Sequence, residues 1–280
     1  MGMRTRFAPS PTGLLHLGHA YAAKFAFDLA RDLGGEFLLR FEDIDTTRVR
    51  EGYYKAIEED LEWLGMAWSG EPVRQLNRLP AYMEALEILK TMEVVYPCFC
   101  TRREIQEEIA GIGNAPHGPE GAIYPGICKK LGVSERADRL AAGLSHCWRL
   151  DAEKAAALCG DLTFEDTGQG RGEVKVEPSV LGDVVLARKD IATSYHLAVV
   201  VDDAAQRISD VTRGEDLLFS THVHRTLQAL LGLPVPRYHH HRLILDKSGK
   251  RLAKRDRARS LQVFREADML PEEVIALWDA

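Results

Sequence analysis

Apolar side chains follow two different spacings along the chain, and the alternation between them predicts the order of helices and strands. Residues 14–35 place apolar side chains at helical spacing and end in two glycines, which favour a helix end. Residues 36–43 form an apolar run that ends in two carboxylates, a pattern typical of a buried strand. Further strands are predicted at residues 5–10, 194–203 and 237–245, and further helices at residues 53–65, 80–92 and 215–232.

This order of elements predicts an α/β fold in which helices cover a parallel sheet. In such folds, ligands bind beyond the carboxyl ends of the strands. The first strand is expected to end near residues 9–13, where the next helix should begin. Residues 109–127 are rich in Gly and Pro, so they are predicted to form a long loop or insertion rather than a core element.

The composition limits the class of protein. The chain has 280 residues, of which 45% are hydrophobic and 28% are charged, as in a soluble globular protein with a real core. It contains no apolar run of membrane-spanning length and no signal-peptide core near its start, so no membrane association is expected. Its five cysteines are an odd number, and two of them stand as Cys-x-Cys. Both features argue against a disulfide framework and for a cytoplasmic protein.

The net charge of -6 conceals a basic segment near the end of the chain. Residues 237–259 carry nine Lys or Arg and only two Asp, and the turn "KSGKRLAKRD" holds Lys250, Arg251, Lys254 and Arg255. A solvated charged loop is one explanation. The other is a basic loop that moves to stabilise a triphosphate while it is cleaved.

Two histidines bracket a glycine in the segment "PTGLLHLGHA". His16 and His19 are three residues apart at the predicted start of a helix, where free N–H groups and the helix dipole favour phosphate. Gly18 carries no side chain and leaves room for a flat base. Both imidazoles are placed to donate hydrogen bonds to phosphate charge that develops in a transition state. Two incidental helix histidines would also explain this short pattern.

Taken together, these motifs resemble those of class I aminoacyl-tRNA synthetases. "HLGH" resembles the HIGH motif, and "RLAKR" resembles the KMSKS loop. The glutamyl branch of the family is indicated by five segments between residues 6 and 256: "RFAPSPTGLLHLGHA", "FLLRFEDIDTTR", "SYHLAVVVDD", "VTRGEDLL" and "RLILDKSGKRLAKRD". The resemblance implies a monomer with a Rossmann-like catalytic domain and an inserted α/β subdomain that bears zinc. It also implies activation of L-glutamate by ATP and Mg²⁺ to give glutamyl-adenylate.

The resemblance also assigns roles to single residues. Carboxylates of glutamate favour guanidinium partners, whereas its ammonium favours a carboxylate such as Glu42. Binding of L-glutamate is assigned to Arg6, Phe7, Ala8, Pro9, Ser10, Glu42, Tyr195 and Arg213. Binding of ATP is assigned to His16, Gly18, His19, Arg251 and Lys254, of which His16, His19 and Lys254 are catalytic. Arg251 keeps the charge of the first KMSKS lysine, but Ala253 lacks the hydroxyl of the KMSKS serine.

Three cysteines suggest a metal site. Cys98, Cys100 and Cys128 need one further ligand to hold a structural zinc ion tetrahedrally. His117 is a candidate on chemical grounds, because a phenol must lose a proton at a pKa of about 10. The pattern Cys-x-Cys…Tyr-x-x-x-Cys instead resembles the zinc site of a short paralogue within the glutamyl branch, which implies Tyr124. The alternative is that these are reduced core cysteines, as we expect for Cys147 and Cys159.

Full-length members of the glutamyl branch resemble this chain only in their N-terminal part and continue into a helical anticodon-binding region. Here about two dozen residues follow the "RLAKR" loop, so we expect no such region. The expected divisions are residues 1–95 and 191–245 for the two catalytic halves, 96–190 for the zinc-bearing insertion, and 246–280 for the KMSKS-like loop and a short helical tail.

This arrangement resembles a truncated branch of the family. Enzymes of that branch activate glutamate without tRNA and esterify queuosine, a modified base in the anticodon of tRNA(Asp). Two alternatives remain open from the sequence. One is a minimal enzyme that charges an acceptor end, and the other is a non-catalytic paralogue that binds glutamate, zinc or tRNA.

Overall fold

A computed structural model describes residues 2–111, 117–119, 121–244 and 260–278, and it places a parallel sheet at the centre of the molecule. Strands β1 (Arg4–Phe7), β2 (Glu36–Phe41) and β3 (Val73–Arg74) pair in parallel in the order β1-β2-β3. A second group of strands lies next to β1. The two groups are joined by a hydrogen bond from the N–H of Ser209, the residue before β11, to the Arg4 carbonyl at 3.1 Å.

This second group has the order β11-β12-β8-β9. Its strands are β11 (Asp210–Gly214), β12 (Arg237–His241), β8 (Thr163–Asp166) and β9 (Gly172–Lys175). The first three run parallel, and β9 is antiparallel to β8. The predicted α/β fold with parallel strands is therefore confirmed, and β8 brings a part of residues 96–190 back to the central strands.

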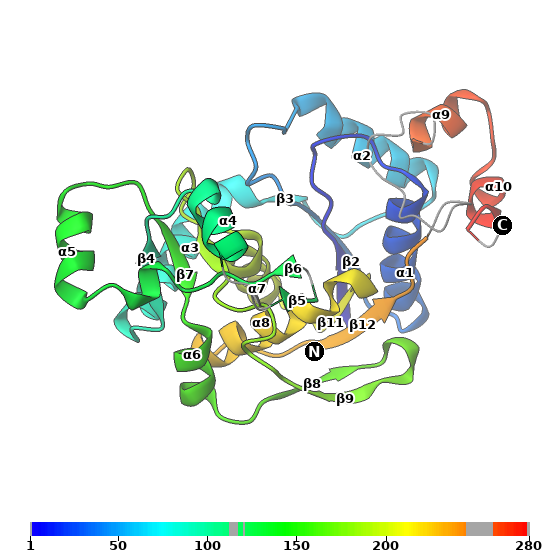
Figure 1. Ribbon diagram of the computed structural model, residues 1–280. Helices are drawn as coiled ribbons and strands as arrows, with labels where there is room; N and C mark the ends of the chain where they lie inside the picture. Colours follow the sequence, from blue (N-terminus) through cyan, green and yellow to red (C-terminus); the bar gives the residue numbers. More distant parts are fainter. Residues whose placement is uncertain (1, 112–116, 120, 245–259, 279–280) are drawn as a thin grey trace.

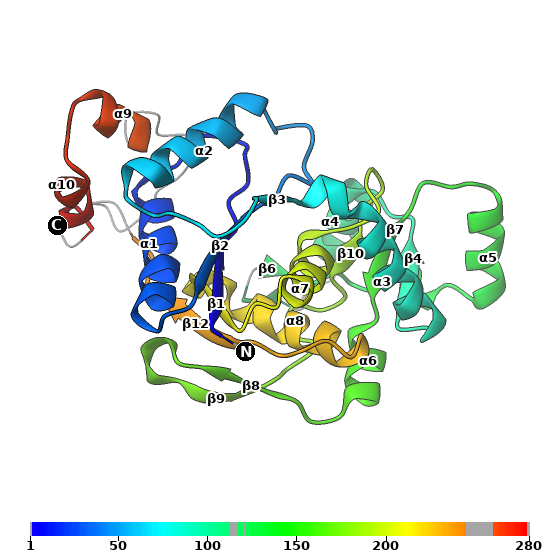
Figure 2. The ribbon, with the colours of Figure 1, turned by 180° about the vertical axis from the view of Figure 1, so that it is seen from behind.

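Helices cover these strands, as Figures 1 and 2 show from opposite sides. Helix α1 (Leu17–Asp32) lies against β1, and its buried face consists largely of alanines that allow a close approach. The Thr5 hydroxyl donates to the Ala26 carbonyl at 2.8 Å and so joins the helix to the strand. The other helices are α2 (Glu51–Trp63), α3 (Leu79–Thr91), α7 (Tyr195–Ala205), α8 (Leu218–Leu230), α9 (Leu261–Glu266) and α10 (Pro271–Ala276).

A separate antiparallel sheet of order β10-β7-β4 forms the end of the molecule opposite α9 and α10 (Figure 1). Its strands are β4 (Val95–Cys98), β7 (Cys147–Leu150) and β10 (Val185–Ala187). The chain segments that connect these strands form α4 (Arg102–Gly111), α5 (Val133–Ala141), α6 (Ala152–Cys159) and the short strands β5 (His117–Gly118) and β6 (Gly121–Ala122). Short 3-10 helices span Gln75–Arg78, Cys128–Lys130, Gly168–Gly170 and Glu215–Leu217.

Two predictions of secondary structure are wrong, and burial explains the first. Residues 194–203 form most of α7 instead of a strand. This helix packs between α3 and α8 and buries side chains on several sides, so its apolar residues 197–201 are consecutive and show no helical period. The second error is at the start of α1, which begins at Leu17 after a loop that follows β1, and not near residues 9–13.

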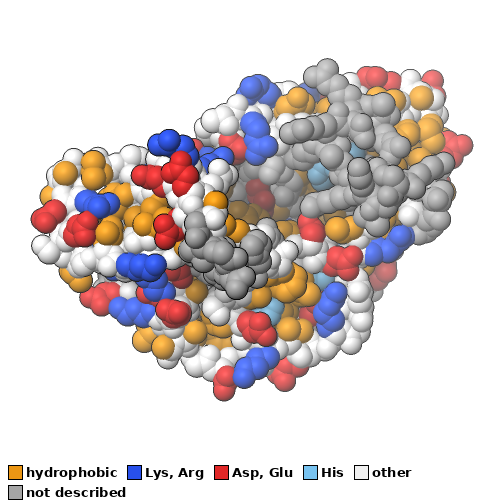
Figure 3. Space-filling view, viewed as in Figure 1, with side chains coloured by type: hydrophobic (Ala, Val, Ile, Leu, Met, Phe, Trp, Pro, Cys, Tyr) orange, Lys and Arg blue, Asp and Glu red, His pale blue; other side chains and the backbone are white. Residues whose placement is uncertain are grey.

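Charged side chains of both signs are interspersed over the face in Figure 3, without a large patch of one sign among the described residues. Among the helices in the described ranges, none combines the length and the apolar character needed to cross a membrane. The basic turn at residues 247–256, with Arg251, Ala253 and Lys254, lies outside the described residues.

Candidate active site

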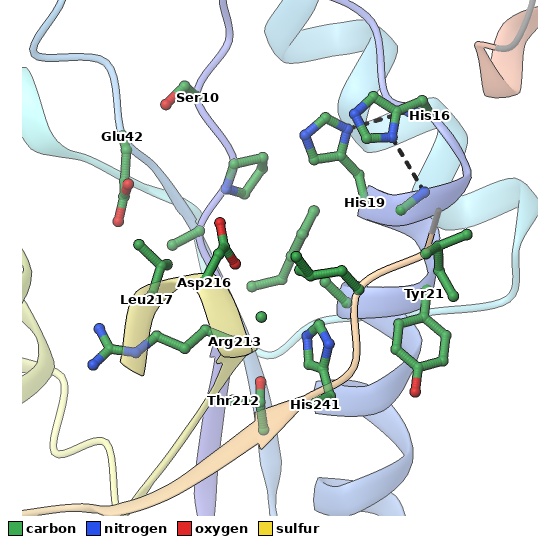
Figure 4. Close-up of a pocket in the computed structure, with 18 of the residues that line it drawn as sticks. Ser10, His16, His19, Tyr21, Glu42, Thr212, Arg213, Asp216, Leu217 and His241 are labelled. Carbon is green, nitrogen blue, oxygen red and sulfur yellow. Dashed lines mark hydrogen bonds between the residues drawn. The ribbon is translucent and has the colours of Figure 1, made fainter. Parts of the chain in front are cut away.

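A cavity opens beyond the carboxyl ends of β1, β2, β11 and β12 and is bounded by the start of α1. It brings together every described residue that the sequence assigned to glutamate or ATP. These are Arg6, Phe7, Ala8, Pro9, Ser10, His16, Gly18, His19, Glu42, Tyr195 and Arg213. Figure 4 shows Glu42 and Arg213 on one side of the cavity and the two imidazoles on the other. Residues from five separate segments therefore meet at the sheet edge where an α/β fold binds ligands.

The two histidines form the cap of α1. His16 is the N-cap residue, and its Nδ1 accepts the Gly18 N–H at 3.1 Å. In return, Nδ1 of His19 accepts the His16 N–H at 3.2 Å. A neutral imidazole has one donor nitrogen and one acceptor nitrogen, so both rings carry their proton on Nε2. The cap therefore fixes two imidazoles in the tautomer that donates from Nε2, which is the form suited to binding phosphate oxygens.

Arg6 is held by a buried ion pair at the end of β1. Its Nε donates to Oδ1 of Asp203 at 2.9 Å, its Nη2 donates to Oδ2 at 3.3 Å, and its Nη1 donates to the Thr212 carbonyl at 3.1 Å. The two contacts with Asp203 use one edge of the guanidinium, and the contact with Thr212 uses one N–H of Nη1. One N–H on each terminal nitrogen is left for a carboxylate in the cavity, since a guanidinium has five N–H groups.

Arg40 is a second arginine that binds the Asp203 carboxylate. Its side chain is fully buried, and its Nη1 donates to Asp203 and to Gln206, each at 2.8 Å. Burial alone disfavours a charged Asp203, but Arg6 and Arg40 hold the pKa of its carboxyl below the ordinary value. This network was not predicted, because residues 194–203 were expected to form a strand. The available signal was the acidic pair Asp202 and Asp203 at the end of an apolar run.

Among the described residues, Glu42 is one of two carboxylates that line the cavity, the other being Asp216. It follows β2, and its backbone N–H donates to the Pro9 carbonyl at 3.0 Å, which ties it to the loop after β1. Burial raises the pKa of Glu42 to about 7, and Arg40 and Arg6 act in the opposite direction. Arg40 lies 4.0 Å from its carboxylate, so no close ion pair within the described residues competes with a bound cation.

Arg213 and Tyr195 complete the side of the cavity near Glu42. Arg213 is the fourth residue of β11, a strand that the sequence analysis did not predict. Its Nη1 lies 3.4 Å from the hydroxyl of Tyr195, the first residue of α7. The cavity is also lined by residues that the sequence analysis did not assign, namely Tyr21, Ala22, Thr212, Gly214, Asp216, Leu217, His241, Arg242, Leu243 and Ile244. Several of these flank Arg213 within "VTRGEDLL", which was the available signal.

A second cluster lies at the end of β4. The Sγ atoms of Cys98, Cys100 and Cys128 lie within 4.8 Å of one another. The Tyr124 hydroxyl lies 3.3 Å from Sγ of Cys98 and 3.5 Å from Sγ of Cys100. Arg149 sits 3.9 Å from the centre of the Tyr124 ring and adds positive charge. Three thiols and one phenol oxygen around a common point fit the tetrahedral donor set of zinc. The side chain of His117 lies outside the described residues.

The comparisons with known proteins agree with this geometry. Residues 2–278 match the family model for the catalytic domain of class I tRNA synthetases for glutamate and glutamine (E and Q). The chain belongs to this family. Members of the family are ligases, and the expected enzyme class is thereby confirmed.

Two curated relatives extend the match. The chain is 50% identical over 278 residues to a glutamyl-Q tRNA(Asp) synthetase of Rhodobacter capsulatus, covering 97% of this chain and 98% of the relative. It is 46% identical over 277 residues to a protein of the same name from Nocardia farcinica, covering 99% of this chain and 84% of the relative.

A solved structure shows the same fold. The glutamate tRNA ligase of Elizabethkingia meningosepticum, in complex with its amino acid, superposes with a TM-score of 0.75 at 32% identity. The superposition covers 91% of this chain but 52% of the solved one, so the chain spans about half the length of that enzyme.

Proposed function

We propose that this enzyme activates L-glutamate with ATP, without tRNA, and transfers it to queuosine in the anticodon of tRNA(Asp). The observation that carries the proposal is the cavity itself. Among the charged side chains that line it, Arg6, Arg213 and Glu42 lie at strand ends and offer two guanidinium groups and one carboxylate, which match the two carboxylates and the ammonium of glutamate. Two imidazoles at a helix N-terminus lie on the opposite side, where they suit the phosphates of ATP.

The reaction has two steps. A carboxylate oxygen of glutamate attacks the α-phosphorus of ATP, pyrophosphate leaves, and glutamyl-adenylate forms. A hydroxyl oxygen of queuosine then attacks the activated carbonyl carbon, AMP leaves with the bonding electrons, and the hydroxyl proton is released as the ester forms. Mg²⁺ bound with ATP would neutralise part of the phosphate charge. His16 and His19 donate from Nε2 to phosphate oxygens, and Lys254 and Arg251 are assigned to the phosphates by their sequence motif alone.

The name shared by the two curated relatives supports queuosine as the acceptor. The deciding experiment supplies labelled glutamate, ATP and three purified tRNAs: tRNA(Asp) with queuosine, tRNA(Asp) without it, and tRNA(Glu). We expect label on the queuosine-containing tRNA(Asp) alone. Label on tRNA(Glu) alone would identify an enzyme that charges an acceptor end. Absence of both transfer and glutamate-dependent ATP–pyrophosphate exchange would identify a non-catalytic binding protein.

Binding of glutamate should weaken as the pH falls through 7. In the free enzyme Glu42 gains a proton below its raised pKa of about 7, and a neutral carboxyl no longer pairs with the ammonium of glutamate. The KM for glutamate should therefore be about tenfold higher at pH 6 than at pH 8. The KM for ATP, measured in the same assays, should change less than twofold.

The variant Glu42→Gln separates this effect from general acid sensitivity. Its KM for glutamate should be high at every pH and should lack the slope between pH 6 and pH 8. A slope in the variant equal to that of the wild type would show that another group is responsible.

We further propose that Cys98, Cys100, Cys128 and Tyr124 hold one structural zinc ion. Elemental analysis should find about one zinc per chain, and a chelator should lower the thermal unfolding midpoint. Replacing Tyr124 by Phe should weaken zinc retention at least tenfold, because one donor is lost. Replacing Cys159, which lies apart from this group, by Ala should not change the zinc content.

The variant His117→Ala completes this test, since His117 is the other candidate for the fourth ligand. If His117→Ala released zinc while Tyr124→Phe retained it, the imidazole would be the ligand and the phenol would not. A protein free of zinc with full activity and an unchanged unfolding midpoint would exclude the site.

A further inference from the structure

Arg213 is surrounded by neutral acceptors instead of a carboxylate. Its Nε donates to Nε2 of His240 at 3.2 Å, and its Nη1 donates to Nδ1 of His224 at 3.0 Å. Its Nη2 donates to the Thr221 hydroxyl, and its contact with Tyr195 is longer, at 3.4 Å. Arg6 has an acidic partner, whereas Arg213 has none among the described residues, so its positive charge is left for a ligand.

The hydrogen bonds of His240 require one tautomer. Its Nε2 accepts from Arg213, so the proton of the neutral ring must lie on Nδ1. Nδ1 is 3.0 Å from Oδ2 of Asp166, a fully buried carboxylate that accepts this hydrogen bond. The same oxygen also accepts from Nη1 of Arg171 at 3.2 Å. Oδ1 of Asp166 is oriented by two backbone N–H groups, those of Gly168 at 2.9 Å and His240 at 3.2 Å.

A pair of histidines on the helices, His224 and His196, lies on another side of Arg213. Nδ1 of His224, on α8, accepts from Arg213, so its proton lies on Nε2 and points to Nδ1 of His196, on α7, at 3.2 Å. Burial, opposed by the hydrogen bond to Asp166, lowers the pKa of His240 to about 4. Burial and then the charge of Arg213 lower the pKa of His224 well below its ordinary value. Both rings are thus neutral acceptors at physiological pH.

We propose that Asp166 is a positioning residue for glutamate binding: it fixes the tautomer of His240, and His240 and His224 together fix the orientation of Arg213. The proposal rests on the proposed function, because the ligand of Arg213 is taken to be a carboxylate of glutamate. Asp166 and His240 lie behind the cavity and do not line it, so their effect on the substrate passes through Arg213.

The variant Asp166→Asn tests this chain of contacts with little change in volume. The two backbone N–H groups keep the amide oxygen at the position of Oδ1, which places the amide NH₂ against Nδ1 of His240. Nδ1 must then accept, the ring proton moves to Nε2, and this N–H opposes the Nε–H of Arg213. We expect the KM for glutamate to rise at least tenfold, with kcat changed less than threefold and the KM for ATP changed less than twofold.

Asp210 offers a matched control on the same pair of strands. It is also fully buried, and its Oδ1 lies 2.8 Å from Nε2 of His239, the neighbour of His240 on β12. It does not contact Arg213, so Asp210→Asn should leave the KM for glutamate within twofold of wild type. Nitrogen-15 NMR of the histidine rings should show loss of one Nδ1–H tautomer in Asp166→Asn and its retention in Asp210→Asn.

Two variants of His224 test the proposal even if the Asp166→Asn protein does not fold. His224→Leu removes the acceptor for Nη1 of Arg213 and should raise the KM for glutamate at least tenfold. His224→Gln supplies an amide oxygen and should recover most of this loss. An unchanged KM in His224→Leu, or a flipped tautomer with an unchanged KM in Asp166→Asn, would overturn the proposal. A wild-type enzyme without glutamate-dependent exchange would instead overturn the proposed function, and the NMR experiment would still test the Asp166–His240 arrangement.

Discussion

Replacing His16 by Asn should lower kcat for glutamate-dependent ATP–pyrophosphate exchange by about two to three orders of magnitude, while the thermal unfolding midpoint stays close to that of the wild type. His16 has two roles, since Nδ1 caps α1 and Nε2 is the donor proposed for phosphate. Asn is among the best N-cap residues, so it preserves the first role and removes the second. Losing one preorganised donor to transition-state charge costs about 10²–10³ in kcat.

His16→Ala provides the complementary measurement. Alanine removes both the cap and the donor, so stability should fall by about 1 kcal/mol in addition to the loss of activity. Asp151→Asn exchanges one good cap for another at the start of α6, outside the cavity, and should leave both quantities unchanged. If His16→Asn retained more than a tenth of wild-type kcat, the histidine would serve as a helix cap only.

Much of the fold was predictable because, in most elements, the spacing of apolar residues in the sequence matches the side of the element that is buried. Helices α1, α2 and α3 have one buried face, and strand β2 is bounded by Gly and acidic residues. Prediction failed where the surroundings decide the conformation. Residues 197–201 form an unbroken apolar run since α7 is enclosed by other elements, so periodicity could not distinguish a helix from a strand. Strand β11, with only five residues in a polar sequence, owes its form to pairing with β12.

The site was predictable to a different extent. The resemblance of their motifs placed residues such as Glu42 and Arg213 at one site, and the structure gathers them at the edge shared by the carboxyl ends of β2 and β11. The groups behind them were not predictable, since Asp166 and Asp203 reach their partners only through pairing of segments that are distant in sequence. Sequence thus identified the motif residues that line the cavity, whereas the rest of its lining and the residues that hold those side chains in position required the structure.

Replacing Arg6 by Lys should lower kcat/KM for glutamate by about two to three orders of magnitude and leave the KM for ATP within about twofold of wild type. Arg6 uses one edge of its guanidinium for Asp203 and leaves two N–H groups for a carboxylate. A lysine ammonium keeps the charge but cannot hold Asp203 and a second carboxylate in the same planar geometry. Two charge-assisted hydrogen bonds, at about 1.5–3 kcal/mol each, would together account for about two to four orders of magnitude, and the charge that lysine retains keeps the expected loss in the lower part of this range.

The matched control is Arg4→Lys on the same strand. Arg4 is paired with Glu36, its side chain is 34% exposed, and it does not line the cavity, so its replacement should change kcat/KM by less than twofold. The unfolding midpoint of Arg6→Lys shows whether the loss comes from the substrate contact or from the fold. Asp203 retains Arg40 at 2.8 Å, and a large drop in stability is therefore not expected. If the KM values for glutamate and ATP rose equally, Arg6 would be needed for the shape of the whole cavity and not for recognition of glutamate.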